Sequence, residues 1–116
     1  NWEAILFSSH HKLDNLVAII DRNQLQSINS TEETLQLEPF AEKWRAFGWN
    51  VIEVDGHNHD EIFKALKKNN KIDSPLCIIA HTTKGKGVSF MENNNLWHYR
   101  SPQNAEYRNA IKELEK

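Results

Sequence analysis

Three short apolar runs along the chain have the character of buried β-strands. They span Leu16–Asp21, Asn50–Val54 and Leu76–His81, and the first and last consist mainly of valine, isoleucine, leucine and alanine. Such runs are typical of parallel strands that are covered on both faces, because neither side of the strand is left to solvent. The pattern therefore predicts a mostly parallel sheet that is buried between helices.

Segments with a helical spacing of apolar residues separate these runs, and most have a recognisable cap or stop signal. The expected helices, with the apolar residues that share one face of each, are Trp2–His10 (Trp2, Ile5, Leu6), a helix that begins at Pro39 and ends at Gly48 (Phe40, Trp44, Phe47), a helix capped by Asn58 and Glu61 (Ile62, Phe63, Leu66), and a helix after Ser101-Pro102 (Tyr107, Ala110, Ile111, Leu114). The stripe of Ile62, Phe63 and Leu66 is expected to be buried. The alternation of strands and helices predicts the fold class, which is α/β with three layers, α/β/α.

Composition and charge argue against a nucleic-acid-binding or membrane protein. The 116 residues suffice for one hydrophobic core, and the net charge of −2 comes from acids and bases that are mixed along the chain. This balance leaves no basic surface for nucleic acid or an anionic membrane, and no apolar run approaches the roughly 20 residues that cross a bilayer. The single cysteine, Cys77, lies in an apolar run and is expected to be a buried structural thiol. We expect a cytoplasmic protein with no nucleic-acid or membrane partner.

Polar segments follow each predicted strand, at the sheet edge where open parallel sheets bind ligands. They are Asp21-Arg22-Asn23, Asp55-Gly56-His57 and Thr82–Gly87. Carboxylate and carbonyl oxygens suit a hard cation such as Mg²⁺, and a lysine between glycines can approach a phosphate closely. Each segment alone also has an ordinary explanation, as an Asx cap, a tight turn or a flexible basic loop. The residues by themselves leave both interpretations open.

Taken together and in order, the motifs of this chain resemble the transketolases, in particular the short N-terminal subunit of split bacterial forms. The matching segments are Trp2-Glu3-Ala4, Leu13–Gln26, Leu37-Glu38-Pro39, Phe47-Gly48-Trp49, Val54–His57, Lys84–Val88, Met91-Glu92-Asn93 and Trp97-His98. They cover nearly the whole chain, and their order and spacing are specific. The resemblance implies a partial thiamine-diphosphate-binding fold, with residues 1–116 as the C-terminal part of that domain.

The resemblance also implies a site for Mg²⁺ and thiamine diphosphate. It assigns the side chain of Asn23 and the backbone carbonyl of Leu25 to the metal, so that Asn23 binds metal and cofactor together. Lys84 matches a lysine of the cofactor site. His98 matches a histidine that contacts the cofactor or the bound sugar, which implies both cofactor binding and a catalytic role. The implied reaction moves a two-carbon ketol unit between sugar phosphates.

Two departures from the family pattern qualify this expectation. The Gly-Asp-Gly motif, whose aspartate is the other protein ligand of Mg²⁺, is missing from the chain, and Tyr99 stands where a glycine usually follows Trp-His. The pyrimidine-binding domain, or C-terminal transketolase subunit, is an expected partner, and the parent enzyme is expected to be a homo-oligomer. The chain alone is therefore expected to be inactive. The alternatives are a non-catalytic remnant or scaffold with the same fold, or part of another thiamine-diphosphate enzyme such as deoxyxylulose phosphate synthase.

Overall fold

The computed structural model of the protein describes residues 1–68 and 73–115. The chain divides into two compact units. The first, named the sheet unit, contains Asn1–Arg22 and Leu37–Thr82, and the second, named the loop unit, contains Asn23–Gln36 and Thr83–Lys116. The three strands belong to the sheet unit, whereas the loops that follow the first and third strands belong to the loop unit.

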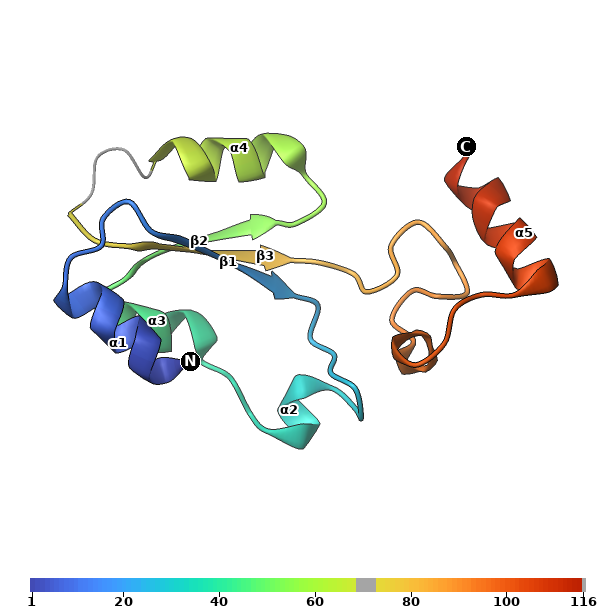
Figure 1. The fold of residues 1–116 in the computed structure, drawn as a ribbon, viewed down its shortest axis with the longest axis horizontal. Coiled ribbons are helices and arrows are strands. Elements are labelled where there is room, and N and C mark those ends of the chain that lie inside the picture. Colours follow the sequence, from blue (N-terminus) through green and yellow to red (C-terminus); the bar gives the residue numbers. More distant parts are fainter. Residues whose placement is uncertain (69–72, 116) are drawn as a thin grey trace. The chain divides into compact units, whose positions relative to one another are not determined.

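A three-stranded parallel sheet forms the centre of the sheet unit (Figure 1). Its strands are β1 (Val17–Arg22), β2 (Asn50–Asp55) and β3 (Leu76–His81), in the order β1-β3-β2. The register aligns the last residues of all three strands, so their carboxyl ends lie at one edge. This arrangement confirms the predicted parallel sheet, with boundaries that differ by one residue at β1 and β2.

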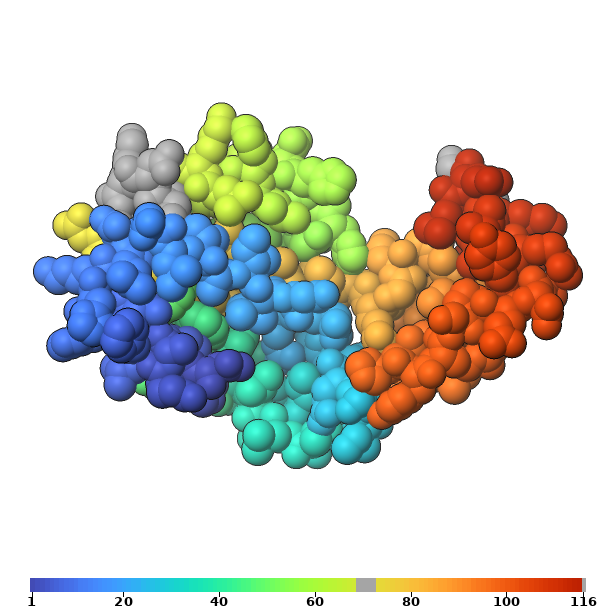
Figure 2. Space-filling view, in the orientation of Figure 1, coloured from blue at the N-terminus to red at the C-terminus, as the bar shows by residue number. Residues whose placement is uncertain are grey.

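Helices cover both faces of this sheet. The helices α1 (Trp2–His10) and α3 (Phe40–Ala46) lie on one face, and α4 (His59–Lys68) lies on the other (Figure 1). In the space-filling view, α1 (dark blue) and α4 (yellow-green) form outer layers of this unit (Figure 2). The predicted α/β/α layering is thereby confirmed. Among the residues that the structure describes, no helix has the length and apolar character needed to cross a membrane.

An aromatic cluster joins α1 and α3 to the sheet. Trp44 and Trp49 are 5% and 6% exposed, with their ring centroids 4.9 Å apart, and they pack with Phe40 against the buried strand β3. The indole nitrogen of Trp49 donates to the backbone oxygen of Ile5 at 2.9 Å, which fixes α1 on this face. In the same cluster, burial raises the pKa of Cys77 to about 12. The predicted burial of this thiol is confirmed, because Cys77 has no exposed surface.

The motif Leu37-Glu38-Pro39 has a structural role at the beginning of α3. One carboxylate oxygen of Glu38 accepts from the backbone N–H of Phe40 at 2.8 Å, and the other accepts from the buried guanidinium of Arg22 at 2.9 Å. The hydrogen bond from the N–H of Phe40 does most to hold the pKa of Glu38 below its ordinary value, and the bond from Arg22 lowers it further. Glu38 therefore ties the last residue of β1 to the first turn of the helix that covers it.

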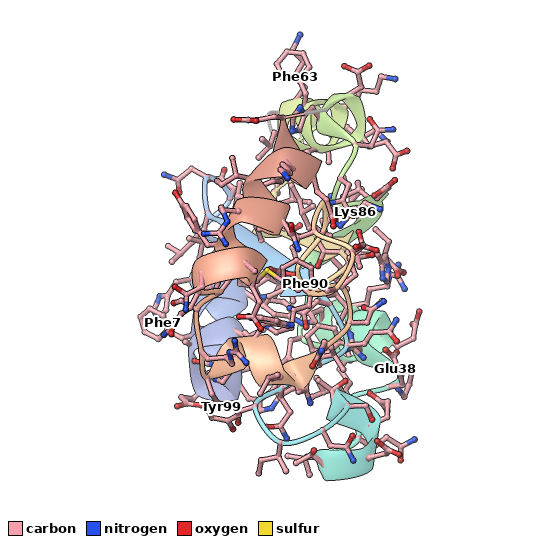
Figure 3. The ribbon with its side chains drawn as sticks, turned by 90° about the vertical axis from the view of Figure 1, so that its right-hand side faces the viewer. Phe7, Glu38, Phe63, Lys86, Phe90 and Tyr99 are labelled. Carbon is pink, nitrogen blue, oxygen red and sulfur yellow. The ribbon has the colours of Figure 1, made fainter. Side chains whose placement is uncertain are left out.

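The expected buried stripe of α4 is wrong in part, because Phe63 and Leu66 are both exposed. Phe63 is 56% exposed and points outward (Figure 3), with the ammonium nitrogen of Lys67 4.3 Å from its ring centroid. The residue that α4 buries is Ala65, which packs on the sheet together with the partly buried Ile62. Ile62 and Ala65 are three residues apart and share one face, and the neighbouring Phe63 is turned roughly 100° away from Ile62.

The loop unit contains less regular structure. Its elements are α2 (Thr31–Thr34), the short 3₁₀ helix η2 (Asn95–His98) and α5 (Asn104–Leu114). On α5, the expected apolar side is mostly accessible, because Tyr107 and Leu114 are 55% and 61% exposed and only Ala110 is buried. This unit is built mainly from turns that are held by side-chain hydrogen bonds.

The first and last apolar runs, which became β1 and β3, were expected to be covered on both faces of the sheet. This expectation holds for β3 and fails for β1. Ile78 of β3 has no exposed surface, whereas Ile19, its partner in register on β1, is 56% exposed. The reason is position in the sheet: β3 lies between two strands, and β1 has a described neighbour on one side only.

This pair of isoleucines gives a matched test of the core. We expect Ile78→Val to lower the free energy of unfolding by about 0.5–1.5 kcal/mol, because it removes a methylene group from a fully packed site. Ile19→Val removes the same group from an exposed site and should change stability by less than about 0.5 kcal/mol. Urea denaturation of both variants measures the difference, and equal losses would contradict the observed burial of β3.

Candidate functional site

A small cavity in the loop unit brings together residues from three separate segments of the chain. Its volume is about 170 Å³. Its lining residues are Asn23, Leu25, Gln26, Lys84 and His98. All four residues that the sequence singled out line it, although they were chosen from segments far apart in the chain. Gln26 was missed as a lining residue. It belongs to the matching segment Leu13–Gln26 but carries no charge or special spacing that would mark it.

The loop after Asn23 forms one wall of this cavity. The side-chain oxygen of Asn23 accepts from the backbone N–H of Leu25 at 2.9 Å, and Gln24 between them has a φ of 62°. The chain then folds back, with Gln26 N–H donating to the oxygen of Asn29 at 3.0 Å. An amide oxygen has two lone pairs, so the bond to Leu25 leaves Asn23 able to contact a cation as well.

The segment from Lys84 to Asn93 forms a second, glycine-containing loop that carries the lysine of the cavity. The backbone oxygen of Lys84 accepts from the N–H of Asn93 at 2.9 Å, which closes the loop at its base. Gly85 has a φ of +75°, and a Cβ on it would lie 2.5 Å from the backbone oxygen of Met91. Glycine is required at position 85, because any side chain there would clash with backbone.

The two lysines of the Lys-Gly-Lys-Gly motif have different surroundings. Lys84 lines the cavity, whereas the ammonium group of Lys86 lies 3.7 Å from a carboxylate oxygen of Glu92. The same oxygen of Glu92 accepts from the backbone N–H of Gly87 at 3.2 Å. Glu92 therefore fixes the far side of the loop and partly balances Lys86, which leaves Lys84 as the cation of the motif that lines the cavity.

The turn that carries His98 is held by its neighbours. Asn94 caps η2 by accepting from the N–H of Leu96 at 3.0 Å. The indole of Trp97 donates to the backbone oxygen of Phe90 at 3.0 Å, and the ring centroids of these two residues lie 5.2 Å apart. The two residues of the Trp-His motif therefore have different roles. Trp97 anchors the turn, and the adjacent His98 lines the cavity.

The donor set of the cavity suits a hard cation bound to an anion. Its lining residues include an asparagine, a lysine and a histidine, whose side chains carry an amide oxygen, an ammonium group and an imidazole, and Leu25, whose polar atoms are those of its backbone. Oxygen ligands are those that Mg²⁺ prefers, and lysine is a common partner of phosphate. Within the described ranges, no three His, Cys, Asp or Glu side chains gather as metal ligands. At about 170 Å³, the cavity is smaller than the roughly 300 Å³ or more of complete ligand pockets, and it fits one end of a larger cofactor.

The segment Asp55-Gly56-His57 lies outside this cavity, in the sheet unit. The side-chain oxygen of Asp55 accepts from His57 N–H at 2.9 Å, and Gly56 N–H donates to the oxygen of His81 at 2.8 Å. A Cβ on Gly56 would lie 2.4 Å from the methyl carbon of Thr82. The residues form a tight turn, as the simpler of the two sequence interpretations expected.

The chain is similar to known transketolases along nearly its whole length. Residues 1–114 match the family described as transketolase, thiamine diphosphate binding domain. One subunit of the apulose-4-phosphate transketolase of Phocaeicola vulgatus is 45% identical, over 97% of this chain and 41% of that protein. The 6-deoxy-6-sulfo-D-fructose transketolase subunit SqwG of a Clostridium species is 41% identical, over 99% of this chain and 42% of that protein.

The fold agrees with this similarity. The crystal structure of the transketolase from Campylobacter jejuni superposes with a TM-score of 0.77 and 33% identity, over 82% of this chain and 15% of that one. The chain spans less than half the length of the two curated relatives. Because the family match extends over residues 1–114, the chain belongs to the thiamine diphosphate binding domain family of the transketolases.

Proposed function

We propose that this chain is the C-terminal part of the thiamine-diphosphate-binding domain of an enzyme that transfers a two-carbon ketol unit between sugar phosphates. The observation that carries the proposal is the cavity, where Asn23, Leu25, Lys84 and His98 meet. Family membership alone gives the fold and the type of cofactor, whereas the cavity gives a place where this chain can hold the cofactor's charged end. Sugar-phosphate substrates are supported by the name of the apulose-4-phosphate relative.

In this proposal, the cavity holds the magnesium and diphosphate end of the cofactor. The side-chain oxygen of Asn23 and the backbone oxygen of Leu25 bind Mg²⁺, and Lys84 neutralises the diphosphate charge. The bond between Asn23 and the N–H of Leu25 supports this assignment, because it keeps both oxygen donors on one tight turn. The ion pair of Lys86 with Glu92 supports Lys84 as the diphosphate-binding lysine.

His98 acts on the reacting sugar in this proposal. Thiamine diphosphate, when bound, supplies the carbon nucleophile that ketol transfer requires. The imidazole of His98 donates a hydrogen bond to the sugar or moves a proton at one of its oxygens. The anchored neighbour Trp97 supports this role, because a catalytic side chain needs a rigid backbone beneath it.

A partner supplies the rest of the active site in this proposal. The partner is a pyrimidine-binding domain or a C-terminal transketolase subunit, and the assembled parent is a homo-oligomer. Leu6 and Phe7 of α1, which are 56% and 58% exposed, support such an association, because apolar side chains on one helix are typical of interfaces. The free, buried Cys77 supports a reducing, cytoplasmic location.

Calorimetric titration with thiamine diphosphate in excess Mg²⁺ tests the proposal. We expect the chain alone to bind weakly or not at all, because the missing aspartate ligand and the partner domain complete the site. The enzyme assembled with its pyrimidine-binding partner should bind with micromolar or tighter affinity, and thiamine without its diphosphate should bind much less. Absence of binding by the assembly would favour the non-catalytic scaffold. Tight binding by the chain alone would contradict the incomplete site.

A further inference from the structure

Tyr99, which directly follows the cavity residue His98, makes a specific contact next to the cavity. Its hydroxyl donates to the backbone oxygen of Ser27 at 2.8 Å. The phenol is 68% exposed, yet its tip is fixed to a loop that lies 72 residues earlier in the sequence. The contact therefore joins the two segments that contribute His98 and Leu25 to the cavity.

The acceptor of this bond belongs to the cavity wall. Ser27 follows Gln26, which lines the cavity and donates its N–H to Asn29 at 3.0 Å across the turn. At the base of the same loop, Thr31 N–H donates to the oxygen of Gln24 at 2.9 Å. The bond from Tyr99 reaches this loop from outside, at Ser27 near its turn, and therefore adds a restraint against local opening of the wall.

The ring of Tyr99 also contacts the imidazole of His98. The two ring centroids lie 5.0 Å apart, and the rings are nearly perpendicular at 87°. Edge-to-face packing of this kind restricts the rotation of the smaller ring. The next residue, Arg100, stacks on Trp97 with its guanidinium carbon 4.7 Å from the ring centroid, and it pairs with Glu106. The backbone of Tyr99 is thus held on both sides.

We infer that Tyr99 is a positioning residue that holds the loop of Asn23, Leu25 and Gln26 through its hydroxyl and orients His98 through its ring. The hydroxyl contact sets how closely the metal-binding wall approaches the turn that carries His98, and the ring contact sets the direction of the imidazole. The consequence for cofactor affinity and turnover rests on the proposed function. The restraint of the loop does not, and it can be tested without any cofactor.

The first test measures amide hydrogen exchange in Tyr99→Phe, which loses the hydroxyl and keeps the ring. A single hydrogen bond of this kind contributes about a fivefold change in an opening equilibrium. We expect the amides of Gln26 and Thr31 to exchange about fivefold faster, while the amide of Asn93, in the other loop, keeps its rate. Tyr107→Phe is the control, because Tyr107 is an exposed tyrosine on α5 outside the cavity. Unchanged rates for Gln26 and Thr31 in Tyr99→Phe would overturn the restraint.

The second test uses the assembled enzyme and separates the two contacts. Tyr99→Phe should raise the dissociation constant for Mg²⁺–thiamine diphosphate about fivefold and leave turnover at saturating cofactor unchanged. Tyr99→Leu loses the ring as well and should also lower turnover. If Asn23→Ala weakens cofactor binding and Tyr99→Phe does not, the inference is wrong and the proposed function stands. If Asn23→Ala has no effect, the proposed function is wrong. Equal turnover in the two Tyr99 variants would overturn the role of the ring.

Discussion

Turnover of the assembled enzyme is expected to fall about 10²–10⁴-fold in His98→Ala, even when the cofactor is saturating. The reason is that His98 is proposed to act on the sugar, so cofactor binding cannot replace the missing imidazole. Steady-state kinetics with ketose phosphate donors, at increasing Mg²⁺ and thiamine diphosphate, measures the effect. The dissociation constant of the cofactor should change much less than turnover.

Two controls separate this role from a structural one. His59→Ala removes an exposed histidine from the first turn of α4, in the sheet unit, and should leave turnover unchanged. Urea denaturation of His98→Ala should show an almost unchanged free energy of unfolding, because His98 is exposed. A large loss of stability together with the loss of turnover, or full recovery with excess cofactor, would refute the assignment.

Asn23→Ala is expected to raise the apparent dissociation constant of thiamine diphosphate about 10- to 100-fold. The substitution removes a proposed oxygen ligand of the metal that anchors the diphosphate, and excess Mg²⁺ and cofactor should restore part of the activity. Asn23→Asp keeps an oxygen at this position, able to accept from Leu25 N–H and to bind Mg²⁺, and should lose much less affinity. Titration of the cofactor at several fixed Mg²⁺ concentrations distinguishes the variants.

The matched control for Asn23 lies in the same loop. The side-chain oxygen of Asn29 accepts from the backbone N–H of Ser30 at 2.9 Å, much as that of Asn23 accepts from Leu25 N–H, but Asn29 does not line the cavity. Asn29→Ala therefore loses a comparable local bond without losing a proposed ligand. If both alanine variants weaken cofactor binding equally, the effect belongs to the loop and the proposed metal ligation is wrong.

The sequence by itself determined the strands, the covering helices and the layered α/β/α fold. The runs that became β1 and β3 were recognisable because they consist mainly of valine, isoleucine, leucine and alanine, which is typical of parallel strands in a layered sheet. The aromatic spacing of α3 was recognisable because side chains four residues apart share a face of a helix. Both signals are local, so they can be recognised without knowledge of the rest of the chain. The candidate residues Asn23, Lys84 and His98 came from the resemblance to the transketolases.

Only the tertiary structure decided which polar segments meet and which remain simple turns. Asn23, Lys84 and His98 share a cavity of the loop unit, whereas the Asp55-Gly56-His57 segment forms a tight turn of the sheet unit. The structure also decided that the Tyr99 hydroxyl reaches the loop of Ser27. Such contacts depend on where segments that are distant in the sequence lie in the folded chain. The two loops that form the cavity are irregular, so no periodic pattern of side chains predicts the path of their backbone.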